Sequence, residues 1–406
     1  MKKDGRNMPN EEVLIGKQKA PSEGKRNVFL FGMISLFTDI SSEMIYSLVP
    51  GFLRSLGATS TLIGLIEGIA EATAALSKSF FGWLSDRLKN RKLFVFLGYS
   101  LSALSKPFLF LAGHWSAVLG VRFADRTGKG LRSPARDALL SQSVSAKRRG
   151  LGFGFQRAMD NLGAASGPLL AMLILYLSHN NMRLVFLLSV IPALIGVSFI
   201  FFVREIRSLS RTVKEARKDG PLDARFIWFS IAMVVFTLGN SSNAFLLLRA
   251  QDSGISLSLV PLIWTVYSAV AALSSPVFGH LSDKIGRRWV ILVSFVVYSA
   301  VYFLFGNFST PLAMWLLFAA YGVHHGLSEG VFRAFIADLI PAERRATAYG
   351  IYETMIGLAL FPASLIFGLL WDKLSPQIAF YTGAGLSLLA GVIFIVTQRG
   401  RRGVDD

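Results

Sequence analysis

The chain has 406 residues, of which 52% are apolar, and its mean hydropathy of +0.50 is typical of a membrane protein rather than a soluble one. Its formal net charge of +17 is concentrated in alternate loops between apolar runs, which indicates membrane orientation and argues against a nucleic-acid partner. The absence of cysteine excludes disulfides, thiolate metal sites and cysteine nucleophiles.

Twelve apolar stretches are long enough to cross a bilayer as helices, which takes about 20 residues each. They lack the strict alternation of membrane β-strands. The sequence therefore predicts an all-α polytopic membrane protein with twelve transmembrane helices. In chain order the stretches are 28–53, 61–85, 93–113, 115–140, 151–177, 184–203, 226–248, 257–280, 289–306, 311–338, 346–370 and 376–397.

Charged segments divide the chain into two sets of six stretches. We expect a disordered N-terminus over 1–27 without a cleavable signal peptide, a first bundle over 28–203, a linker over 204–225, a second bundle over 226–397 and a tail over 398–406. One set of loops holds nearly all of the interhelical Lys and Arg, so the positive-inside rule predicts that both termini and the linker are cytoplasmic. The other set holds only Arg54, Arg183, Arg249 and Lys373.

The first stretch carries Asp39 and Glu43 one helical turn apart, so both carboxyl groups lie on one face. A charged residue in hydrocarbon is costly and usually lines a cavity. No Lys or Arg lies within this stretch to neutralise the pair, and we expect one of the carboxyl groups to carry the coupling proton. The alternative is a structural pair neutralised by a basic neighbour.

The second stretch repeats this spacing with Glu67 and Glu71. Either these residues line the same cavity, or Glu67 lies near the membrane interface.

A phrase at the end of the second stretch, Gly82 to Arg87, returns about half a chain later as Gly279 to Lys284. A repeat of this period predicts two copies of one large unit. With Gly286, Arg287 and Arg288, the second copy resembles the G-x-L-x-D-R-x-G-R-R loop of the major facilitator superfamily. The first copy departs from it at Lys89 and Asn90.

The resemblance covers residues 28–397 and implies two pseudo-symmetric six-helix bundles that rock against each other. It also implies a conformational latch at the repeated phrase; the alternative is a polar turn that only fixes topology. The run Glu43-Met44-Ile45 resembles the first helix of multidrug/proton antiporters. The residues assigned to the latch are Gly82, Asp86, Arg87, Gly279, Asp283, Gly286 and Arg287.

The fourth stretch is the most highly charged, and we expect Arg122, Arg126 and Lys129 to line the cavity. They suggest an anionic or zwitterionic substrate, or partners for the carboxylates of the first and fifth helices. The run from Arg126 to Arg132 resembles the superfamily motif R-x-x-Q-G-x-G, with Lys129 in place of Gln and Arg132 in place of the last Gly.

The fifth stretch contains Gly163, Gly167 and Pro168, which resemble the G-x-x-x-G-P motif of superfamily antiporters and favour export. Small residues four apart also allow ordinary close packing of helices. Arg157 and Asp160, three residues apart, are expected to pair locally.

Charged residues of the second half fall opposite those of the first in the repeat. Glu353 matches Arg157, and Glu329 matches Arg132, so these residues are candidates for salt bridges between the halves. His325, one turn before Glu329, is a candidate for proton relay; the alternative is a plain polar contact between helices. The adjacent His324 points about 100° away on a helix, so we expect no metal site.

The sequence has no phosphate-cradling Gly-Lys motif, zinc-binding H-E-x-x-H or nucleophile elbow, so we expect neither an enzyme nor a cofactor. The combined features predict a monomeric secondary transporter of the inner plasma membrane that exports a small organic solute in exchange for protons. Its partners would be the lipid bilayer, the solute and protons. The alternatives are uptake of a solute or metal chelate, or a non-transporting sensor or scramblase on the same fold.

Overall fold

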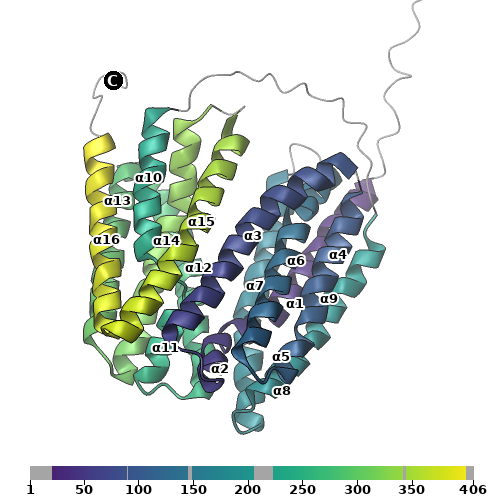
Figure 1. Ribbon diagram of the computed structural model, residues 1–406. Helices are drawn as coiled ribbons and strands as arrows, with labels where there is room; N and C mark the ends of the chain where they lie inside the picture. Colours follow the sequence, from purple (N-terminus) through teal and green to yellow (C-terminus); the bar gives the residue numbers. More distant parts are fainter. Residues whose placement is uncertain (1–20, 89, 145–148, 205–222, 342–343, 399–406) are drawn as a thin grey trace, which may run out of the picture.

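The computed structural model describes residues 21–88, 90–144, 149–204, 223–341 and 344–398, and every regular element within these ranges is helical (Figure 1). The elements are α1 (Pro21–Tyr46), α2 (Val49–Ser55), α3 (Ser60–Leu88), α4 (Arg91–Ser105), α5 (Pro107–Leu111), α6 (Trp115–Ser143), α7 (Arg149–Leu177), α8 (Met182–Leu188), α9 (Val190–Phe202), α10 (Ala224–Gly239), α11 (Ala244–Asp252), the 3₁₀ turn η3 (Leu257–Leu259), α12 (Val260–Ile285), α13 (Arg287–Asn307), α14 (Pro311–Leu339), α15 (Arg345–Lys373) and α16 (Pro376–Gln398).

Single helices, or two helices that meet at a short break, form twelve crossings in the described ranges. Nine are long and apolar enough to span a membrane. The other three, α3, α6 and α14, have 29 residues each and carry Glu67, Arg126 and His325 among their apolar side chains. The predicted all-α fold class is confirmed. Proline at the start of α2 and of α5 accounts for two of the breaks, since it cannot continue the preceding helix.

The helix boundaries correct one expectation. The helix α1 begins at Pro21, so residues 21–27 of the predicted disordered N-terminus are helical. The remaining residues of that segment, most of the predicted linker and most of the tail lie outside the described residues. The predicted domain limits otherwise stay predictions.

The helices α1 to α9 form a first half and α10 to α16 a second half, which stand side by side in Figure 1. In the first half α1 packs on α7 and α4 on α6; in the second, α12 packs on α14 and α13 on α16. The helix α9 ends, and α10 begins, at the top of Figure 1, which we call the linker end. The opposite end, which holds α2 and α11, is the far end.

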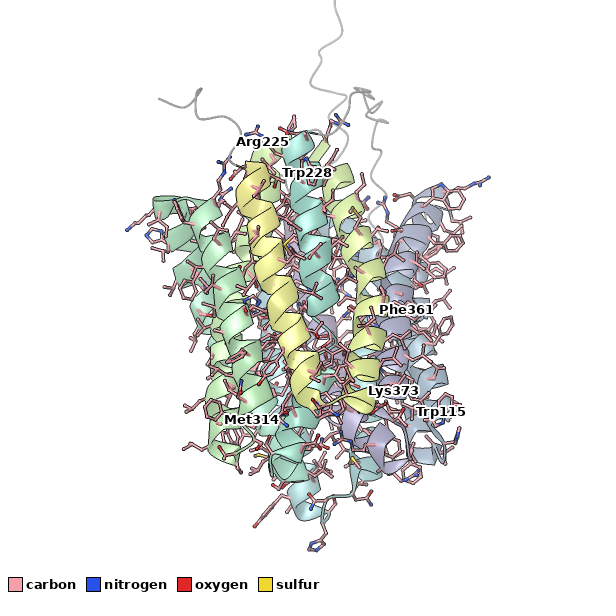
Figure 2. All side chains as sticks on the ribbon, turned by 60° about the vertical axis from the view of Figure 1, so that its left-hand side comes forward. Trp115, Arg225, Trp228, Met314, Phe361 and Lys373 are labelled. Atoms are coloured by element: carbon pink, nitrogen blue, oxygen red, sulfur yellow. The ribbon has the colours of Figure 1, made fainter. Side chains whose placement is uncertain are left out.

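The surface of the helices is largely apolar, as a bilayer requires. Large side chains such as Leu173 and Val296 are about half exposed on it. Figure 2 shows Trp228 and Arg225 near the linker end and Trp115 and Lys373 near the far end. Tryptophan and basic residues at both ends of an apolar belt are typical of the two membrane–water interfaces.

The two halves meet along α3 and α15, most closely at the far end. Asp372 of α15 accepts hydrogen bonds from the backbone N–H groups of Ser60 (3.1 Å) and Thr61 (2.6 Å) at the start of α3. Arg54 and Asp252 form an ion pair between α2 and α11. Figure 1 shows the halves diverging toward the linker end. Asp372 of the second half therefore caps the start of α3 in the first half. This cap can form only while the far end is closed.

Loss of this cap is expected to open the far end. Asp372→Ala leaves two N–H groups of α3 without their partner, which costs about 1 kcal/mol and shifts the conformational equilibrium roughly fivefold. A cysteine introduced at Ser364, which is fully buried on α15, should then react about fivefold faster with N-ethylmaleimide. The control is Asp223→Ala, which removes the cap of α10 at the linker end. Equal rates in both variants would contradict the role of Asp372.

Candidate functional site

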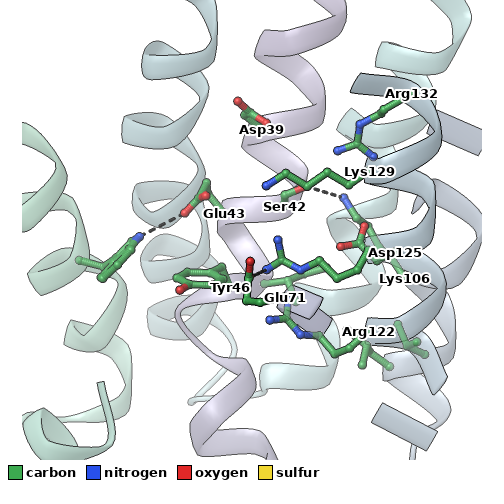
Figure 3. Close-up of a pocket in the computed structure, with 15 residues that line it drawn as sticks. Asp39, Ser42, Glu43, Tyr46, Glu71, Lys106, Arg122, Asp125, Lys129 and Arg132 are labelled. Atoms are coloured by element: carbon green, nitrogen blue, oxygen red, sulfur yellow. Dashed lines mark hydrogen bonds and ion pairs between the residues drawn. The ribbon is translucent and has the colours of Figure 1, made fainter. Parts of the chain in front are cut away.

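A cavity of about 310 Å³ lies in the first half, between α1, α3, α6 and the junction of α4 with α5, and Trp264 of α12 in the second half also lines it (Figure 3). It brings together many of the charged residues predicted from the sequence. The lining residues are Asp39, Ser42, Glu43, Ile45, Tyr46, Glu71, Lys106, Leu109, Val121, Arg122, Asp125, Arg126, Lys129, Arg132 and Trp264. Carboxylates and cations alternate around it, so the site is suited to a polar solute.

Two arginines of α6 are paired with the carboxylates of α3. Arg122 lies 2.6 Å from Glu67, and both side chains are almost completely buried. Arg126 lies 3.1 Å from Glu71. Of the two alternatives for the α6 cations, pairing with carboxylates of the first and fifth helices is wrong for both arginines, because they form ion pairs with carboxylates of α3. Glu67 is buried behind the cavity wall, where Ser242 of the second half donates a hydrogen bond to it (3.4 Å).

The carboxyl groups of α1 have different surroundings. The Asp39 carboxyl group lies close enough to that of Asp160 on α7 for the two groups to interact. Two adjacent carboxyl groups can share one proton, because a carboxylate accepts the hydrogen bond that a carboxyl O–H donates. Glu43 accepts a hydrogen bond from the indole Nε1–H of Trp264 (3.2 Å). Within the described part of the chain, neither Asp39 nor Glu43 has an ion-pair partner.

The glycines of the fifth stretch determine how close α7 lies to these carboxyl groups. A Cβ atom on Gly163 would lie 2.6 Å from the carbonyl oxygen of Leu36 and 2.9 Å from Cβ of Asp39. A Cβ atom on Gly167 would lie 2.9 Å from Cβ of Glu43. Pro168 follows within the same helix. The absence of side chains at these glycines allows the close approach of α1 and α7.

A side chain at this contact is expected to push the helices apart. Gly163→Val would place methyl groups against the backbone of α1, so we expect little folded protein or, if it folds, loss of transport. The control is Gly154→Ala on the same helix, since no atom lies within 4 Å of a Cβ there. Size-exclusion profiles of both variants in detergent provide the measurement. Normal folding and transport of Gly163→Val would show that the close approach is dispensable.

A chain of charges leads from this site to the second half. Arg157 lies 3.8 Å from Asp160 and 3.6 Å from Glu329 of α14. Glu329 also meets His325 at 2.9 Å and Arg333 at 3.6 Å. The predicted pairing of opposite repeat positions is wrong in detail, because Glu353 lies 3.5 Å from Arg333 rather than beside Arg157. No group of three or more potential metal ligands occurs among the described residues.

The first copy of the repeated phrase connects α3 to neighbouring helices of the first half. Asp86 lies 2.7 Å from Arg91 at the start of α4. The guanidinium group of Arg87 stacks over Trp83, 5.6 Å from the ring centroid. Gly82 faces Pro134 of α6.

The second copy similarly joins α12 to α13 and α14. Asp283 lies 3.2 Å from Arg287, which also pairs with Asp338 of α14. Gly286 has φ of +91°, a conformation that favours glycine and forms the turn into α13. Gly279 has open space around it. Each phrase thus holds together helices of one half, and the latch role stays a prediction.

Sequence reasoning missed several residues of the cavity. Lys106 lies within the third apolar stretch, and a cation inside such a stretch is a sequence signal for a cavity residue. Its ammonium group donates hydrogen bonds to Ser41 (2.6 Å) and Ser42 (3.3 Å). Asp125 lies in the fourth stretch, and its signal was a carboxylate among the cations of that stretch. Trp264 had no signal, because its role depends on packing between the halves.

The family model of the Major Facilitator Superfamily matches residues 31–231 and 227–405. The chain belongs to this superfamily. It is 36% identical over 395 residues to an uncharacterized MFS-type transporter of Methanocaldococcus jannaschii, covering 95% of this chain and 98% of the relative. It is 23% identical over 403 residues to the quinolone resistance protein NorA of Staphylococcus aureus, covering 92% of this chain and 96% of NorA.

Solved structures of superfamily transporters share the fold. A bacterial homolog to the human lysosomal transporter Spinster, in an inward-facing and occupied conformation, aligns with a TM-score of 0.75 at 15% identity, over 92% of this chain and 96% of that chain. The nucleoside transporter NupG aligns with a TM-score of 0.74 at 14% identity, over 92% and 100%. The predicted superfamily fold is confirmed. This superfamily member is a multi-pass secondary transporter, not an enzyme.

Proposed function

We propose that this transporter exports a small organic solute in exchange for protons by alternating access. The observation that carries the proposal is the adjacency of the Asp39 and Asp160 carboxyl groups, because Asp39 lines the cavity and two such groups can share one proton. An antiporter needs a group that holds a proton while the solute site is empty and releases it when solute binds. A carboxyl pair inside a charged cavity meets this need, because a bound solute changes the charge around it.

Arg157 links the protonation state of the carboxyl pair to the attraction between the two halves. It lies between Asp160 of its own half and Glu329 of the other. When the carboxyl pair loses its proton, Asp160 attracts Arg157 more strongly, and the pull on Glu329 weakens. The proton would thus change an attraction between the halves, which is the step that alternating access requires.

The direction of transport is supported by relatives and by a motif. The similarity to NorA, described as a quinolone resistance protein, extends over nearly the whole chain. The spacing of Gly163, Gly167 and Pro168 resembles the G-x-x-x-G-P motif of superfamily antiporters. We propose a cytoplasmic location for both termini and the linker on the basis of the basic loops; reporter fusions that place Arg225 outside would contradict it.

Liposomes loaded with a pH-sensitive dye test this function. A panel of solutes is first screened for thermal stabilisation of the purified transporter, and each stabilising solute is then added outside the liposomes. If the entering solute is exchanged for protons, protons leave the liposomes and the liposome interior becomes more alkaline. Uptake coupled to protons makes it more acidic, and either an acid signal or no signal with a transported solute would contradict proton exchange. Protein-free liposomes are the control.

A further inference from the structure

The charges of the cavity are not all satisfied by each other. Arg122 and Arg126 have carboxylate partners on α3. Arg132 donates to Ser102 (2.5 Å), and its guanidinium group lies 4.6 Å from the centroid of the Tyr99 ring. Two of these arginines are therefore neutralised by carboxylates, and the third has a hydroxyl group and an aromatic ring as neighbours.

Several lining charges have no ion-pair partner among the described residues, and Lys129 and Glu43 are two of them with opposite sign. Lys129 forms no ion pair with any described residue, and Figure 3 shows its ammonium group near Asp39 and Glu43. Glu43 has only the neutral indole N–H of Trp264. One group is a cation on α6 and the other an anion on α1, so a ligand placed between these helices meets both signs.

An aromatic surface adjoins the two charges. The ring centroid of Trp264 lies 5.3 Å from that of Tyr46 and 4.5 Å from that of Tyr267. Aromatic faces attract both apolar groups and ammonium groups. Because Trp264 belongs to the second half, a ligand in contact with it joins the two halves.

We infer that the cavity binds small zwitterions with an apolar body. The cationic group pairs with Glu43, the acidic group pairs with Lys129, and the body lies against Trp264 and Tyr46. The volume of about 310 Å³ limits the ligand to a small molecule. This assignment rests on the proposed function only in taking the cavity as the solute site. A ligand with one charge leaves the other protein charge without a partner, and this loss weakens binding by about tenfold or more.

Three ligands of one shape test the inference by calorimetric titration of the purified protein at neutral pH. L-phenylalanine carries both charges, L-phenylalaninamide only the positive one and phenylpropionate only the negative one. L-leucine, leucinamide and isocaproate form a second set without an aromatic ring. We expect the zwitterion in at least one set to bind about tenfold more tightly than both of its singly charged partners. Equal or tighter binding of a singly charged partner, or no binding of either zwitterion, overturns the assignment.

Two variants separate the charge contacts from general effects of mutation. Lys129→Gln should make the zwitterion and the amide bind alike, whereas Glu43→Gln should make the zwitterion and the anion bind alike. Lys373→Gln, at the far end of α15, should keep the full preference. Retained preference in both cavity variants overturns the contacts. Titration uses no gradient, so a failure of proton exchange in liposomes leaves this result standing.

Discussion

Asp39→Asn is expected to reduce the solute-driven pH change in dye-loaded liposomes to the level of protein-free liposomes. We propose that Asp39 and its neighbour Asp160 share the coupling proton, because two carboxylates this close repel each other when both are ionised. An amide at position 39 cannot exchange that proton. Exchange of labelled for unlabelled solute, which needs no proton, should continue.

Comparison with two further variants makes this result specific. Asp160→Asn removes the other member of the pair and should have the same effect. Asp137→Asn changes a carboxylate of α6 that pairs with the adjacent Arg136 outside the cavity lining, so its pH signal should persist. If both variants of the pair kept the signal, the coupling proton would have to lie elsewhere, with Glu43 and Glu71 as the next residues to test.

Glu67→Gln is expected to destabilise the fold more than any exposed charge removal. The substitution leaves the guanidinium group of Arg122 buried without its carboxylate, and breaking a buried pair in this way costs about 3–5 kcal/mol. Thermal unfolding of the protein in detergent should therefore occur several degrees lower. In contrast, Asp223→Asn breaks a half-exposed pair with Arg225 and should change stability by less than about 1 kcal/mol.

The double variant Glu67→Leu with Arg122→Leu distinguishes an uncompensated charge from lost packing. Replacing both members of a buried pair with apolar residues is often neutral for stability. Unfolding near the temperature of the unmodified protein would support this explanation. If Glu67→Gln itself unfolded at that temperature, the buried pair would not be a structural necessity.

The sequence was sufficient for the fold because each crossing is a long apolar run, and hydrocarbon leaves few alternatives to a helix. The charged residues of the site were also visible, since each interrupts such a run. Their partners were not. Which carboxylate meets Arg122 depends on how α3 and α6 are rotated about their axes, and spacing along one helix carries no such information.

The carboxyl pair illustrates the same limit. Asp39 and Asp160 were both singled out from the sequence, but their contact depends on the closeness of α1 and α7. That closeness follows from Gly163, which was identified only as a packing motif. Trp264 was not predicted, because an aromatic residue is common in an apolar run. Its contact with Glu43 depends on how the two halves pack together.

The two halves of the chain contribute unequally to the lining of the cavity. Every charged lining residue comes from the first half, and in the cavity described here the second half contributes Trp264. The preference for ligand charge should therefore be determined by the first half, whereas Trp264 of the second half contributes an aromatic contact. A chimera that joins the first half, at the linker, to the second half of the Methanocaldococcus relative would keep the charge preference of this transporter, and the reciprocal chimera would acquire that of the relative. New specificities could then evolve in one half while the other preserved the machinery of movement.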